Sequence, residues 1–73
     1  MVHYRISISG ETKEAMMELA RNYKIQLLNS ISICHIPDTI YTIEAIAVPD
    51  EILLMAKNGY SIQILEEVGM RNH

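Results

Sequence analysis

The chain has 73 residues, of which 49% are hydrophobic and 21% charged, and its formal net charge is −3. This length allows one domain with a thin core and leaves no room for a cleft between two lobes, so we expect no enzyme activity and no cofactor. Nucleic-acid binding normally requires a concentrated basic patch. The six basic residues are instead spread along the chain, so we expect no nucleic-acid partner.

The sequence shows no membrane-spanning segment or signal peptide and contains one cysteine. No apolar run approaches the roughly 20 residues that cross a bilayer, and the opening Met-Val-His-Tyr-Arg lacks the layout of a signal peptide. We therefore expect a cytoplasmic protein with no membrane partner; the alternative is a piece of a longer secreted precursor. The single Cys34 excludes an internal disulfide.

The first third of the chain predicts a strand followed by a helix. Residues 2–9 alternate strictly between apolar and polar side chains, which is typical of a half-buried strand, and Gly10 ends this strand. Residues 12–23 change to apolar positions three and four apart. This spacing predicts an amphipathic helix with Thr12 as its N-cap.

The middle of the chain predicts a hairpin. Residues 25–36 indicate a long strand, in which Asn29 interrupts the apolar face and predicts a β-bulge near residues 28–30. Residues 36–39, Ile-Pro-Asp-Thr, have the chemistry of a turn. Residues 40–48 then form the returning strand.

The last third predicts a short helix and a final strand. Pro49 suits a first helical turn, and Gly59 can adopt the left-handed conformation that stops a helix. The alternation that begins at Tyr60 indicates the last strand. We expect a single domain over residues 1–68 and a loose tail over residues 69–73.

This order of elements, β-α-β-β-α-β, consists of two β-α-β units joined by a hairpin and is that of the ferredoxin-like fold. We therefore predict an α+β two-layer sandwich. In that fold a four-stranded antiparallel sheet carries both helices on one face, and its other face stays uncovered.

The uncovered face is our candidate docking surface, although an ordinary solvated face would have the same composition. Because side chains alternate between the two faces of each predicted strand, this face should carry short polar side chains, with Ile46 and Leu65 as exposed apolar groups. Its central positions carry none of the aromatic side chains that stack RNA bases. The predicted face contains His3, Arg5, Ser7, Thr42, Glu44, Ile46, Ser61, Gln63 and Leu65, joined by Ser30, Ser32 and Cys34 if the bulge is placed correctly. The predicted partner-binding residues are Arg5, Thr42, Glu44, Ile46, Ser61, Gln63 and Leu65.

No residue pattern predicts a catalytic, cofactor-binding or metal-binding site. Cys34 and His35 are adjacent on a predicted strand, so their side chains point to opposite faces and cannot easily bind one metal ion. Residues 7–12, Ser-Ile-Ser-Gly-Glu-Thr, have one glycine and lack the Lys-Ser or Lys-Thr pair of a phosphate-binding loop.

The second half of the chain resembles a known family. The segments Tyr-Thr-Ile-Glu-Ala at 41–45, Val-Pro-Asp-Glu-Ile at 48–52 and Asn-Gly-Tyr-Ser-Ile-Gln-Ile-Leu-Glu at 58–66 are similar to the end of the propeptide domain of zinc carboxypeptidases. Related stand-alone modules resemble the propeptide-type inhibitors of subtilisin-like proteases. The resemblance implies a ferredoxin-like domain that docks its sheet face and a tail onto a protease and blocks its site.

Transferred onto this chain, the resemblance implies a set of docking residues and a tail, from Val68 to His73, that lies near the cleft of the partner. The implied docking residues are Thr42, Glu44, Ser61, Gln63 and Leu65.

Three hypotheses follow for the function. The first is a small non-enzymatic protein-binding module, acting as an inhibitor or chaperone of another protein such as a peptidase. The second is a small-molecule-sensing regulatory domain of the amino-acid-binding type, with its site near residues 9–12. The third is a structural homo-oligomer that pairs through an edge strand, for which residues 25–36 are a long and nearly uncharged candidate. We expect some self-association under each hypothesis.

Overall fold

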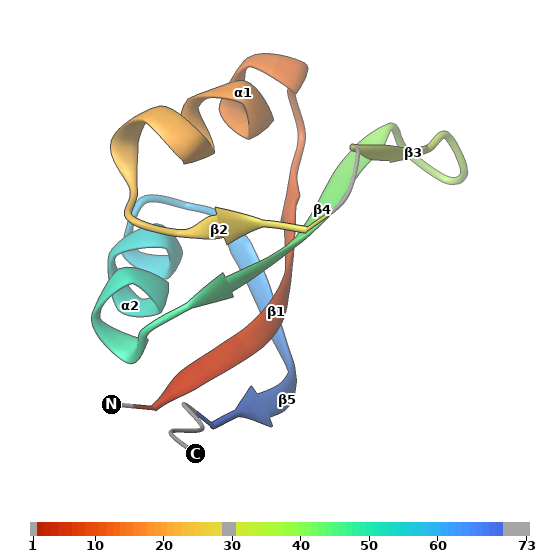
Figure 1. The fold of residues 1–73 in the computed structure, drawn as a ribbon. Helices are drawn as coiled ribbons and strands as arrows, with labels where there is room; N and C mark the ends of the chain where they lie inside the picture. The colour runs from red at the N-terminus through yellow and green to blue at the C-terminus, as the bar shows by residue number, and fades with distance from the viewer. Residues whose placement is uncertain (1, 29–30, 70–73) are drawn as a thin grey trace.

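The computed structural model describes residues 2–28 and 31–69, and its elements follow the predicted order (Figure 1). The elements are β1 (His3–Gly10), α1 (Lys13–Asn22), β2 (Gln26–Leu27), β3 (Ser32–Cys34), β4 (Ile40–Ala47), α2 (Pro49–Lys57) and β5 (Ser61–Val68). Neither helix within the described ranges is long and apolar enough to cross a membrane. The tail predicted over residues 69–73 falls outside the described residues beyond Gly69.

The helices begin and end where local chemistry predicts. The Thr12 side chain accepts a hydrogen bond from the Ala15 N–H at 3.1 Å, so the predicted N-cap of α1 is confirmed. Helix α2 starts directly at Pro49, whose missing N–H costs nothing in a first turn. Gly59 follows this helix with φ of +101°, a backbone conformation that favours glycine and turns the chain into β5.

The architecture is an α+β sandwich of an antiparallel sheet and two helices, as predicted for a ferredoxin-like fold. Strand order is β2-β4-β1-β5, and β3 also pairs with β4. Among the described residues, the sheet therefore has five strands in place of the predicted four. The long edge strand predicted over residues 25–36 is present as the two short strands β2 and β3, which corrects its predicted length.

The register explains the interruption of this edge. Leu27 lies opposite Ala45, whereas Ser32 lies opposite Thr42, so this side contains two more residues than β4 does across the same span. The β-bulge predicted near residues 28–30 falls mainly on Asn29 and Ser30, which lie outside the described residues, so it stays a prediction. Successive side chains on a strand alternate between the two faces of the sheet, so a difference of two residues does not change which face they occupy. Ser32 therefore lies on the predicted open face.

One face of the sheet is buried and the other is open. Both helices cover the same face (Figure 1): α1 packs on β1 and β4, and α2 packs on β5. Every fully buried strand residue belongs to this face, as the pairing of Ile6 with Ala45 and of Ile8 with Ile43 shows. The buried core consists of Ile6, Ile8, Met16, Leu19, Ile43, Ala45, Ala47 and Met55. The other face is therefore free of helices, as predicted.

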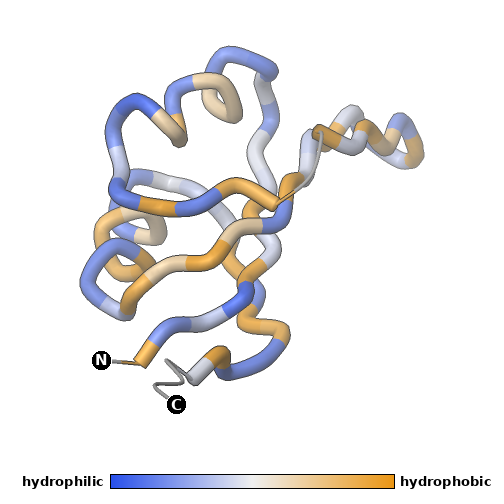
Figure 2. The backbone as a smooth tube through the Cα atoms, viewed as in Figure 1, coloured by the Kyte–Doolittle hydropathy of each residue, from blue (hydrophilic) through white to orange (hydrophobic). Residues whose placement is uncertain are grey.

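A hairpin arm extends away from the sandwich (Figure 1). It consists of β3, the bend at residues 36–38 and the start of β4, and it contributes to the elongated outline of 44 × 19 × 17 Å. Apolar residues continue into this arm (Figure 2). Ile33 is 52% exposed and Ile36 is 83% exposed, because neither helix reaches far enough to cover them.

Candidate functional site: the open sheet face

The register places six of the seven predicted partner-binding residues on one continuous open face. Cross-strand partners in an antiparallel pair share a face. Arg5 lies opposite Ile46, Ser7 lies between Glu44 and Gln63, and Ser9 lies between Thr42 and Ser61. Leu65, the seventh, has no regular cross-strand partner among the described pairs, because it occupies an irregularity in β5.

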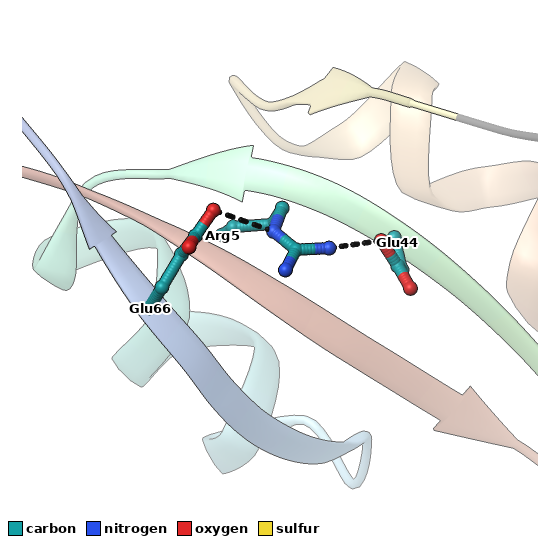
Figure 3. Close-up of polar contacts among 3 residues, drawn as sticks. All are labelled: Arg5, Glu44 and Glu66. Carbon is teal, nitrogen blue, oxygen red and sulfur yellow. Dashed lines mark hydrogen bonds and ion pairs between the residues drawn. The ribbon is translucent and has the colours of Figure 1, made fainter.

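Arg5 forms the centre of this face and bridges the two neighbouring strands (Figure 3). Its Nη1 donates to Glu44 Oε1 at 2.8 Å, and its Nε donates to Glu66 Oε2 at 2.9 Å. The hydrogen bond to Glu66, followed by that to Glu44, raises the pKa of Arg5 above its already high ordinary value. The guanidinium is thus a permanent positive charge held between two carboxylates.

Glu66 reaches Arg5 because of a β-bulge that parity does not reveal. Ile6 pairs with Ile64, but the residue before it on β1, Arg5, pairs with Glu66. Leu65 is therefore an extra residue in β5. The bulge reverses the parity of the rest of the strand. Glu66, which the predicted face does not include, therefore joins the open face and belongs to the candidate site.

Polar and apolar groups surround the Arg5 cluster. The Ser9 and Thr42 hydroxyls lie 3.2 Å apart and share a hydrogen bond. Ile46 is only half-buried rather than fully exposed, whereas Leu65 is 37% exposed. At one end of the face, His3, Lys24 and Ile46 help to line a hollow of about 320 Å³. The open face thus carries mostly hydrogen-bonding side chains, with Ile46 and Leu65 as its apolar groups.

A larger groove lies at the end of the sandwich where β1 turns into α1. It has a volume of about 760 Å³, and its lining includes residues 9–12, which are the segment predicted for a small-molecule site. Three carboxylates line it, from Glu11, Glu14 and Glu18. No Lys or Arg belongs to the described lining.

Two tyrosines form part of the wall of this groove. The rings of Tyr23 and Tyr60 meet edge to face, with 6.0 Å between their centroids. Asn58 Nδ2 donates to the Tyr23 hydroxyl at 2.6 Å, and the Tyr60 hydroxyl donates to the Ala15 carbonyl at 2.8 Å. Burial, followed by the proximity of Tyr23 and Glu18, raises the pKa of Tyr60 above its ordinary value.

Cys34 and His35 lie on the exposed hairpin arm. The Cys34 thiol donates to the Ile36 carbonyl at 3.3 Å, which is a local contact within the arm. Among residues 2–28 and 31–69, no three His, Cys, Asp or Glu side chains are grouped so that they could hold a metal ion.

Comparison with known proteins identifies no relative of this chain. No protein-family model, no curated protein and no solved structure matches this chain significantly. The resemblance of residues 41–66 to the propeptide domains of zinc carboxypeptidases therefore remains a prediction. This segment is one continuous unit of the fold, running from β4 through α2 to β5.

Proposed function

We propose that this chain is a small non-enzymatic protein-binding module that docks its open sheet face onto a partner protein. The observation that carries the proposal is the arrangement around Arg5. A fixed positive charge between Glu44 and Glu66 lies in the middle of a face that neither helix covers. Such a face offers a partner directional hydrogen bonds and charge, while the core on the other side keeps it rigid.

A peptidase is the first partner to test, since the segment that resembles the carboxypeptidase propeptides supplies two of the strands of this face. The mechanism would be occlusion, in which a preformed sheet covers the mouth of an active site. The short serine and threonine side chains suit this role, because they allow close approach of another surface. The sequence-based expectation of a cytoplasmic location belongs to the same proposal.

The test is direct inhibition of purified enzymes. The chain is added to a zinc carboxypeptidase and to a subtilisin-like protease, and substrate hydrolysis is followed over a range of chain concentrations. We expect inhibition of one of the two classes, and at least tenfold weaker inhibition by the open-face variant Thr42→Lys. The helix variant Met17→Lys, at an exposed position of α1, is the matched control and should inhibit like the wild type.

Two results would count against the proposal. Absence of inhibition and of binding for both enzyme classes would remove the peptidase as a partner. Equal loss in Thr42→Lys and Met17→Lys would show that any inhibition does not depend on the open face. Circular dichroism of both variants must first show the wild-type content of helix and strand.

The groove supports a second candidate function, a small-molecule-sensing domain of the amino-acid-binding type. Its residues 9–12 lie in the loop where that hypothesis expects the ligand, and the groove is of a size that holds small molecules. Thermal melting with each of the common amino acids tests this function. A shift that is lost in Glu14→Gln would support it, and unchanged melting with all of them would exclude it.

A further inference from the structure

The outer edge of β5 is the feature that carries a further inference. Within the described residues, β5 pairs with β1 on one side, and it ends the strand order on the other. It has eight residues, whereas the opposite edge consists of β2 with two residues and β3 with three. An edge strand presents a row of main-chain N–H and C=O groups that match another strand, and short edge strands discourage such pairing.

The free edge is confined to the first half of β5. The bulge at Leu65 and the charges of Glu66 and Glu67 are features that hinder edge-to-edge pairing of the second half. The segment Ser61–Ile64 before them carries no charge. Any strand that adds to this edge therefore meets a short and neutral segment.

The core is incomplete at the same edge. Ile62 and Ile64 face the helices, since they pair with the fully buried Ile8 and Ile6. Ile62 packs against the core, but Ile64 remains 55% exposed. An isoleucine on the covered face of a sheet gains hydrophobic free energy from a neighbouring strand beyond the edge, and the described residues place no strand there.

We propose that two copies of the chain pair antiparallel through β5, about a twofold axis at Gln63. In this register Gln63 faces its counterpart, and Ile64 of each copy faces Ile62 of the other on the helix side. The apolar positions are placed symmetrically around Gln63, so the segment is complementary to itself. A second copy therefore fits the edge in strand chemistry, in charge and in apolar pattern. The two open faces would then form one longer surface, although the pairing does not depend on the proposed function.

The area that the proposed β5 pairing buries determines how tightly we expect the dimer to bind. Pairing of so short a segment buries less than the roughly 1,200 Å² of a standard stable interface, so we expect a reversible dimer of the weak class. Sedimentation velocity from micromolar to millimolar chain should show a mass that rises toward that of a dimer. Ile64→Lys should raise the dissociation constant at least tenfold. Met17→Lys, also at an exposed apolar position but on α1, should leave the dissociation constant unchanged.

Cross-linking tests the register. In a Cys34→Ser background, Gln63→Cys places two thiols directly opposite each other across the axis, with Cβ atoms about 5 Å apart. Mild oxidation should link most of the chain into covalent dimers. Glu67→Cys is the control, because the two copies of residue 67 are separated by eight strand positions, about 27 Å.

Three outcomes would overturn the inference. They are a monomer throughout the concentration range, a dimer that Ile64→Lys does not weaken, and equal cross-linking of the two cysteine variants. None of these outcomes bears on inhibition of a peptidase, so the two proposals fail separately.

Discussion

Arg5 and Glu66 are joined by a hydrogen-bonded ion pair of 2.9 Å, although regular pairing of β1 with β5 would place Leu65 opposite Arg5. The bulge at Leu65 makes this contact possible. The Glu66 side chain is 55% exposed, so the ion pair is open to solvent and salt. Its importance lies in the position of the Arg5 guanidinium more than in stability.

We expect Glu66→Gln to lower the free energy of unfolding only slightly, because an exposed ion pair contributes little to stability. The loss should shrink at high salt, because ions screen exposed charges. Urea unfolding at low and high salt measures both effects. Glu67→Gln is the control, since Glu67 lies opposite Tyr4 and not Arg5. An equal salt-dependent loss in Glu67→Gln would contradict the assigned contact.

Helix α2 offers a matched pair of core and surface substitutions. Met55 is fully buried, whereas its neighbour Leu54 is 48% exposed. We expect Met55→Ala to cost about 2–5 kcal/mol, because it leaves a cavity in the core. A domain of this size has a total stability of about 4–11 kcal/mol, so this loss would threaten folding. Leu54→Ala should cost much less, and similar melting temperatures for the two variants would be inconsistent with the core described.

The cap of α1 gives a smaller but specific effect. Thr12→Ala removes the acceptor of the Ala15 N–H and should cost about 1 kcal/mol. Thr12→Ser keeps a hydroxyl oxygen at the same position and should retain most of the wild-type stability. Chemical denaturation of both variants is the measurement. If serine were as destabilising as alanine, the hydrogen bond would not be the source of the loss.

Tyr60 should make the stability of the protein sensitive to alkaline pH. Its hydroxyl donates to the Ala15 carbonyl, and burial raises its pKa above the ordinary value of about 10. The raised pKa means that folding favours the protonated phenol. The resulting stability is therefore fully present below about pH 10 and is lost as the pH rises through the folded-state pKa.

The variant Tyr60→Phe tests this coupling. At neutral pH it should lose about 0.5–1.5 kcal/mol, the net value of one hydrogen bond. It should also lose part of the alkaline decline in stability, because phenylalanine does not titrate. Tyr41→Phe, at the base of the hairpin arm, provides the comparison. An alkaline decline that is identical in wild type and Tyr60→Phe would rule out Tyr60 as its source.

The local elements were predictable because their signals lie within a few neighbouring residues. The alternation in residues 2–9 is driven by burial of one side of a strand, and Thr12, Pro49 and Gly59 act on adjacent backbone groups. The open face followed from the same parity wherever the strands are regular. Thus Thr42, Glu44 and Gln63 were assigned to it correctly.

The prediction was incomplete wherever pairing between distant strands decides the outcome. The bulge at Leu65 depends on how β5 meets β1, and no residue near it marks the irregularity. Glu66 was therefore missed as a partner of Arg5. The edge over residues 25–36 was expected to be one long strand, but its described residues form the two short strands β2 and β3.

The sequence alone determined the order of the elements, the ends of both helices and the sides of the strands that face the core, because each of these depends on local backbone chemistry and on hydrophobic periodicity. Only the tertiary structure decided which residues meet across the sheet. Arg5 and Glu66 are 61 positions apart, and their contact depends on a one-residue shift in register. Such a shift arises from the balance of many weak cross-strand contacts, so no short segment of the chain encodes it.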